Sequence, residues 1–181
     1  MKKINLVFMC FALALATLSC SSDDDGGVVN NPGILSIGET EIQLKAGAIQ
    51  NSGSFDGLTI FDLTLLNSNI ITVDVEPIPE NNIVTLISFE LITDSSQNLT
   101  EGEYGLFDFS DITSQTMASV AILENVDLSS ETEIDEPPFF VEGSLQVISN
   151  GPQYEIEFSG VDNLGREISG NYKGTLTIIE E

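Results

Sequence analysis

The side chains that this sequence offers for chemistry are almost all carboxylates. The 181 residues include 29 Asp and Glu, 5 Lys and Arg, 2 Cys and no His. Catalysis by a serine–histidine or cysteine–histidine pair is excluded, because both schemes use an imidazole as the base. Zinc sites with histidine ligands are excluded for the same reason. The formal charge of −24 also argues against a nucleic-acid partner, because such a chain repels phosphate.

A pair of carboxylates can hydrolyse a glycosidic bond without a histidine. Glu155 and Glu157 could form such a pair, but they alternate with apolar residues and so fall on the polar face of an expected strand. A carboxyl group that acts as a general acid needs an apolar surrounding that raises its pKa, and the sequence around these two residues shows none. We predict that the protein is not an enzyme and has no catalytic residue, with a carboxylate-dependent glycan hydrolase as an alternative.

Oxygen-rich loops are where this chain could hold a cation, and calcium is the cation that such loops prefer. Neither of the two acidic groups in predicted loops has the spacing of a calcium-binding loop, and runs of charge are usually solvated. We therefore predict no metal site and no cofactor, and keep a calcium-dependent adhesin as an alternative. The two groups are Asp108 with Asp111, and Glu131, Glu133, Asp135 and Glu136.

Sugar-binding surfaces usually present exposed aromatic rings, and the chain has no Trp. Tyr154 and Tyr172 fall on the apolar faces of expected strands. Tyr104 and the pair Phe139 and Phe140 are then the aromatic residues left for ligand contact. Glycan binding is a further alternative function.

The first nineteen residues have the composition of an export signal. Lys2 and Lys3 precede an apolar run at 4–18, which is shorter than a membrane-spanning helix. The end of this run, Thr17-Leu18-Ser19-Cys20, resembles the lipobox of bacterial lipoproteins. The resemblance implies that residues 1–19 are removed as a signal peptide and that Cys20 becomes the acylated N-terminus.

The residues after Cys20 indicate where such a lipoprotein would be displayed. They resemble the export signal of Bacteroidetes lipoproteins, which directs these proteins to the outer face of the outer membrane: Ser21, Ser22, Asp23, Asp24 and Asp25. Residues 20–33, which include Cys20, are expected to form a flexible acidic tether with a reach of about 20 Å. The resemblance implies a membrane contact through the lipid, and an envelope protein or an extracellular glycan as a further partner.

Residues 34–181 are expected to form a single all-β domain, because apolar and polar residues alternate with a period of two. Ile71, Val73 and Ile178 fall on the predicted inward faces of their strands. The segment 141–178 is predicted to be a meander of three strands, with turns at 149–152 and 162–165. Glycines at 170 and 174 inside the last long strand would permit a bend or bulge that moves the chain between sheets. A single turn of helix is expected near residues 108–114.

About nine strands at this spacing predict an antiparallel β-sandwich, with a lipocalin-like closed β-barrel as the alternative. Residues 141–178 also resemble the closing meander of small Bacteroidetes lipoproteins, with its Tyr-x-Ile-x-Phe strand, Asp-x-x-Gly turn and Gly-x-Tyr-x-Gly strand. Leu99–Phe107 resembles a segment that precedes this meander. The resemblance implies an all-β fold and no activity. We therefore expect a lipid-anchored surface lipoprotein that serves as a non-enzymatic binding or structural module of the envelope.

Replacement of Cys20 by alanine is expected to abolish lipid attachment, because no other cysteine follows the apolar run. Cells that express the wild-type chain should incorporate labelled palmitate into the protein, and cells that express Cys20→Ala should not. Cys10→Ala is the matched control and should keep the label, since Cys10 lies within the segment that is removed. A wild-type protein without label would refute the anchor.

Overall fold

The computed structural model describes residues 32–74, 76–108, 112–129 and 136–180. The expected all-β class is confirmed, although the described residues form 13 strands where the sequence suggested about nine. In chain order the strands are β1 (Gly33–Ile37), β2 (Thr40–Leu44), β3 (Ala46–Phe55), β4 (Leu58–Leu66), β5 (Ile70–Val73), β6 (Glu76–Pro79), β7 (Ile83–Thr93), β8 (Gly102–Leu106), β9 (Thr116–Asp127), β10 (Phe140–Asn150), β11 (Tyr154–Asp162), β12 (Glu167–Gly174) and β13 (Leu176–Ile179).

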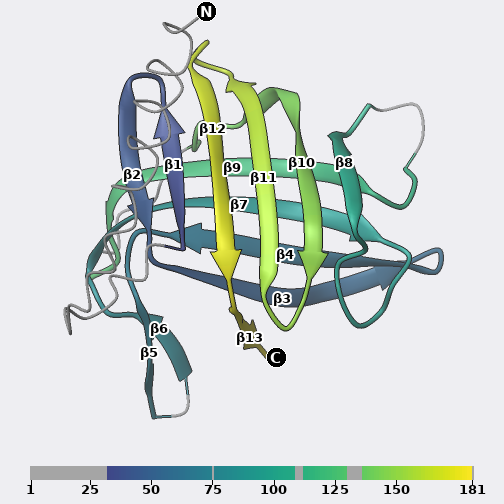
Figure 1. Ribbon diagram of the computed structural model, residues 1–181, viewed down its shortest axis with the longest axis horizontal. Helices are drawn as coiled ribbons and strands as arrows, with labels where there is room; N and C mark the ends of the chain where they lie inside the picture. The colour runs from purple at the N-terminus through teal and green to yellow at the C-terminus, as the bar shows by residue number, and fades with distance from the viewer. Residues whose placement is uncertain (1–31, 75, 109–111, 130–135, 181) are drawn as a thin grey trace, which may run out of the picture.

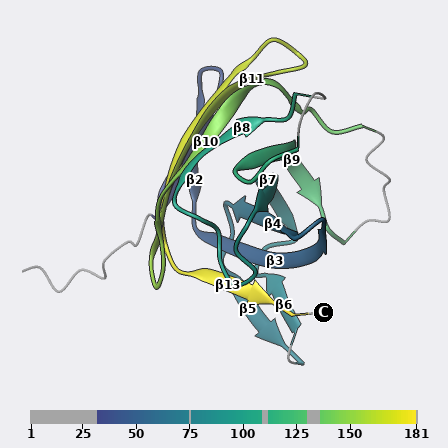
Figure 2. The same cartoon turned by 90° about the vertical axis from the view of Figure 1, so that its right-hand side faces the viewer.

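Eleven of these strands form one mixed sheet in the order β13-β3-β4-β7-β9-β8-β10-β11-β12-β1-β2, and β5 and β6 form a separate hairpin. In Figure 1, β1, β2, β8 and β10–β12 make a front half, and β3, β4, β7 and β9 run across behind it as a back half. Figure 2 shows the sheet curling from one half into the other.

The sheet is therefore a half-barrel, and the predicted antiparallel sandwich is wrong. The closed barrel is wrong as well, because β2 and β13 stand at opposite ends of the strand order. Two of the pairings, β13 with β3 and β8 with β9, are parallel. The two layers belong to one sheet because β8 pairs with both β9 of the back half and β10 of the front half. The chain also passes between the halves with a single residue between strands, Lys45 after β2 and Thr175 after β12. β12 ends at Gly174, and after Thr175 the chain continues as β13, which pairs with β3 of the back half.

The core lies between the two halves. Buried residues such as Leu145 and Ile156 alternate along β10 and β11 with residues that face outward. Phe89 of β7 is fully buried, with its ring centroid 6.4 Å from that of Phe140 on β10 and 5.1 Å from that of Phe158 on β11. Each large apolar side chain buried in this way stabilises the fold by roughly 1.5–3 kcal/mol. The three rings thus join the halves at their crossing.

The predicted meander is confirmed, because β10, β11 and β12 are consecutive antiparallel neighbours. Three apolar residues that were expected to face inward are instead exposed, namely Ile71 (40%), Val73 (45%) and Ile178 (73%). Ile71 and Val73 lie on β5, in the hairpin that projects from the body in Figure 1. Ile178 lies on β13 at the end of the strand order. Alternation identifies an apolar face of a strand, but not whether another layer covers it.

The helical turn expected near residues 108–114 is not present at the described positions 108 and 112–114, and positions 109–111 lie outside the described residues. A search of the described part for a helix long and apolar enough to cross a membrane finds none. The apolar run at 4–18 and the tether up to residue 31 also lie outside the described residues.

Phenylalanine rings of the front half lie against glycines of the neighbouring strand. A Cβ on Gly160 would come within 2.5 Å of both the Phe140 ring and the backbone oxygen of Glu142. A Cβ on Gly170 would come within 2.4 Å of both the Phe158 ring and a backbone oxygen of β1. Gly170 therefore makes room for a ring and does not produce the bend suggested by the sequence.

Gly160→Ala and Gly170→Ala should each lower the free energy of unfolding by about 1–3 kcal/mol, because overpacking forces a ring or the backbone to move. Gly105→Ala in β8 is the matched control, since a Cβ there would meet no atom within 4 Å. The control should be neutral or slightly stabilising. Denaturant titrations of the three variants check this, and equal midpoints for all three would contradict the packing.

Candidate functional site

The residues predicted to form the anchor and the export signal lie outside the described residues: Cys20, Ser21, Ser22, Asp23, Asp24 and Asp25. They stay predictions. The described chain begins at Pro32, whose carbonyl oxygen accepts a hydrogen bond from the backbone N–H of Lys173 at 2.5 Å. The N-terminal segment therefore joins the body at the start of β1, beside the end of β12.

Glu155 and Glu157 lie on the outer face of β11, as predicted. Lys173 Nζ is 2.7 Å from Glu155 Oε2, which makes Glu155 part of an exposed ion pair. Glu157 is also exposed. Both carboxylates face solvent and neither has the apolar enclosure that a general acid needs. The arrangement gives the glycan-hydrolase alternative no support.

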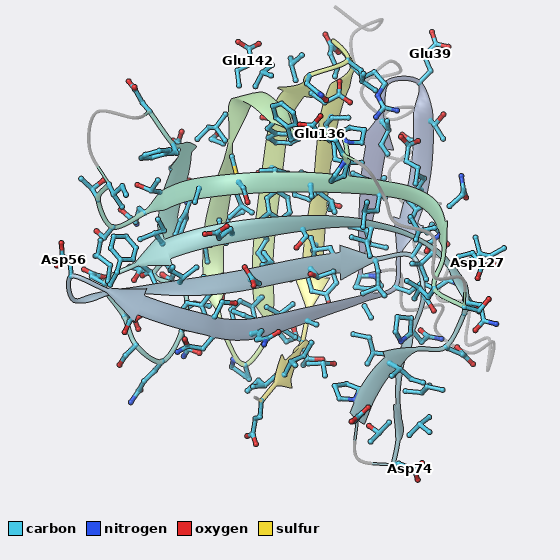
Figure 3. The ribbon with its side chains drawn as sticks, turned by 180° about the vertical axis from the view of Figure 1, so that it is seen from behind. Glu39, Asp56, Asp74, Asp127, Glu136 and Glu142 are labelled. Carbon is cyan, nitrogen blue, oxygen red and sulfur yellow. The ribbon has the colours of Figure 1, made fainter. Side chains whose placement is uncertain are left out.

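The acidic residues of the described part are spread over the molecule. Figure 3 shows Glu39, Asp56 and Asp74 projecting from different turns at different ends. Asp108 and Glu136 are exposed. Within the described residues, no group of three or more acidic, histidine or cysteine side chains could hold a metal ion. The other members of the two predicted groups lie outside the described residues: Asp111, Glu131, Glu133 and Asp135.

The tyrosines do not form a ligand surface. Tyr154 and Tyr172 are 8% and 3% exposed, which confirms their predicted core positions. The prediction that Tyr104 is available to a ligand is wrong, because its side chain is fully buried. Its hydroxyl accepts a hydrogen bond from the N–H of Thr100 at 2.9 Å and donates one to the carbonyl of Thr100 at 3.0 Å. Burial raises the pKa of Tyr104 above its ordinary value.

The aromatic pair at the start of β10 divides between core and surface. Phe140 packs against Phe89 in the core, whereas Phe139 is 41% exposed. The backbone of Phe139 exchanges two hydrogen bonds with Asn163, at 2.9 Å to the Asn163 N–H and 3.2 Å to its Oδ1. One half-exposed ring is not a stacking platform for a sugar.

A row of serines crosses the outer face of the front half. The strand register places Ser144 of β10 opposite Ser159 of β11, Ser159 opposite Ser169 of β12, and Ser169 opposite Ser36 of β1. Side chains opposite one another on adjacent strands have their Cβ atoms about 4.5–5.5 Å apart. These four residues are termed the serine row.

A second polar row lies two positions further along the same strands. Asn171 of β12, Glu157 of β11 and Gln146 of β10 are opposite one another in turn. The two rows line a shallow hollow of about 520 Å³, together with Glu41 of β2. The Oδ1 of Asn171 accepts a hydrogen bond from a backbone N–H of β1 at 3.1 Å, which holds this amide in place. The hollow thus combines hydroxyl, amide and carboxylate groups on a rigid sheet.

The serine row differs in its hydrogen bonding from the outer face of the back half. There, Ser52 donates to Asp62, and Ser119 Oγ donates to Glu90 Oε2 at 3.2 Å. The hydroxyls of the serine row, by contrast, have no hydrogen-bond partner within the part of the chain that the structure describes. They are available to water or to a ligand. Sequence reasoning missed this row, because each serine taken singly has the pattern of an ordinary solvated strand position.

Asp162 is the one buried charged residue among those described. Its Oδ1 accepts hydrogen bonds from the backbone N–H groups of Leu164 at 3.0 Å and Arg166 at 2.8 Å, and its Oδ2 accepts one from Arg166 Nε at 2.7 Å. Arg166 Nη1 also donates to Glu124 Oε1 at 2.6 Å, which links the β11–β12 turn to β9 of the back half. Burial acts to raise the pKa of Asp162, but the hydrogen bonds and charge of Arg166 outweigh burial and lower the pKa. We therefore assign Asp162 a structural role, in which its carboxylate stabilises the β11–β12 turn.

Comparisons of this chain with protein-family models, with curated proteins and with solved structures find no match. The likeness to bacterial lipoproteins therefore depends on the residues quoted above. Any function has to be argued from the chemistry of the site, since a fold alone does not specify one.

Asp162→Asn is expected to destabilise the protein at pH 7 by about 1–3 kcal/mol, because it weakens a buried charge-assisted network. A carboxyl whose pKa is lowered on folding contributes stability above its unfolded pKa of about 3.9, and loses it as the pH falls through the folded pKa. The difference in stability between wild type and variant should therefore shrink below about pH 4. Denaturant midpoints measured from pH 7 to pH 2 check this. Glu157→Gln is the exposed control and should differ little from wild type in stability at every pH. A difference in stability between wild type and Asp162→Asn that stays constant from pH 7 to pH 2 would contradict the prediction.

Proposed function

We propose that the protein is a lipid-anchored lipoprotein displayed on the outer face of the outer membrane, and that its half-barrel is a non-enzymatic binding module. The serine row is its binding surface. The single observation that carries this proposal is the alignment, over a polar hollow on the front half, of four hydroxyls that have no hydrogen-bond partner among the described residues. The motif ending in Cys20 supports the anchor. Pro32, where the described chain begins, does not line the hollow. An anchor before Pro32 is therefore compatible with a ligand in the hollow.

A neutral glycan is the ligand class that fits this surface best. Serine hydroxyls and side-chain amides can both donate and accept hydrogen bonds, as sugar hydroxyls do, and carboxylates accept from sugar hydroxyls. The hollow is open and shallow, which suits an extended chain lying across the strands better than a small enclosed molecule. An anionic polymer is disfavoured, because the chain carries a formal charge of −24.

The double variant Ser159→Val/Ser169→Val removes two hydroxyls at the centre of the serine row. Valine favours strands, so the fold should be retained. Binding of the full-length protein to immobilised neutral cell-surface polysaccharides should weaken about tenfold, the effect of losing two ordinary hydrogen bonds.

Ser54→Val is the matched control. Ser54 is an exposed serine on β3 of the back half, outside the hollow, and the variant should bind like wild type. Equal binding by the double variant would remove the serine row as the site. Failure of the wild-type protein to bind any neutral polysaccharide would remove the ligand class.

A further inference from the structure

A second pocket lies where the N-terminal segment joins the body. It has a volume of about 380 Å³ and lies between the start of β1, the β2–β3 junction and the end of β12. In Figure 1 this is the lower end of the front half, the end from which the β5–β6 hairpin also projects. Its lining includes Pro32, Lys45, Asn69, Gln153, Lys173 and Thr175.

The pocket contains both lysines of the described residues, Lys45 and Lys173. Arg166, the third cationic residue of the described part, is bound to Asp162 and Glu124 at the β11–β12 turn. Among the described residues, the lining of this pocket thus includes both lysines, of which Lys173 is also paired with Glu155.

The two ammonium groups have donors to spare. Lys173 Nζ donates to Glu155 Oε2 at 2.7 Å, which leaves two of its three N–H groups for a ligand. The Lys45 ammonium has no partner within the described part of the chain. Asn69, another lining residue, donates from Nδ2 to Glu80 Oε2 at 2.8 Å. An anion with several acceptor oxygens would supply the Lys45 ammonium with the partner that it lacks among the described residues.

The position of the pocket indicates the source of that anion. Pro32 lines it, and roughly a dozen residues separate Pro32 from Cys20, a length for which a flexible coil reaches about 20 Å. Tethering to a surface over such a span gives an effective ligand concentration on the order of millimolar. A lipid headgroup would then occupy the pocket for a substantial fraction of the time even if its affinity were weak.

We propose that the pocket between Lys45 and Lys173 binds the phosphate group of a membrane lipid headgroup beside the anchor. This inference rests on the proposed lipid anchor. Whole-chain repulsion of phosphate does not prevent it, because the two lysines act at contact distance, whereas exposed charges further away than about 8 Å are largely screened at physiological salt.

The test uses the processed full-length protein, ¹⁵N-labelled, in nonionic detergent micelles and in lipid nanodiscs. In micelles, sn-glycerol 3-phosphate should shift the amide signals of Gly174 and Thr175 with a Kd on the order of millimolar, and glycerol should not. In nanodiscs, the same signals should shift in phosphatidylglycerol relative to a phosphate-free bilayer of digalactosyldiacylglycerol.

Lys45→Gln and Lys173→Gln should each weaken glycerol 3-phosphate binding about tenfold, because each removes a charge-assisted contact. Lys45→Arg keeps the charge and should bind within about threefold of wild type. Glu157→Gln changes a charge on the serine face and should leave the affinity unchanged.

An absence of shifts with glycerol 3-phosphate would overturn the phosphate site. Shifts with glycerol 3-phosphate in micelles but no difference between the two nanodiscs would overturn the headgroup as its source. The micelle titration does not depend on acylation, so a failure of the anchor, reported by the palmitate label on Cys20, is distinguished from a failure of the pocket.

Discussion

The contact of Phe89 with Phe140 and Phe158 is the interaction on which the rest of the structure depends. A single sheet with one apolar face has to cover that face with part of itself, and here the back half covers the front half. The three rings lie where the halves cross, and none is more than 4% exposed. If they were separated, the meander would expose part of its apolar face to water, and the curl of the sheet would lose its central packing contact.

Features on both sides of the front half follow from this constraint. On the inner side, Gly160 and Gly170 have no side chains where the rings need space. On the outer side, the alternation of the strands turns every second residue toward solvent, so strand pairing fixes the relative positions of the four residues of the serine row. The Asp162–Arg166–Glu124 network joins the two halves away from the rings. The site is thus rigid because the core beneath it is rigid.

The sequence predicted what depends on near neighbours along the chain. The meander, its turns and the core positions of Tyr154 and Tyr172 were correct because alternation and turn residues act locally. The strand order was not predictable, since the pairing of β13 with β3 and of β8 with β9 brings together distant segments. Tyr104 was assigned to the surface because its burial depends on the chain folding back at Thr100. The serine row was not predicted because each of the four strands contributes one serine, and only the pairing register of the strands brings the four together.

The pairing of β1 with β12 and of β13 with β3 joins the first strands of the domain to the last two. The first pair cannot form before β12 has been synthesised, and the second cannot form before β13 has been. Topologies dominated by such distant contacts fold slowly, because the entropy of closing long loops is lost before the contacts form. Until then, β1 and β3 each present an unpaired edge, which is a template for pairing with another chain.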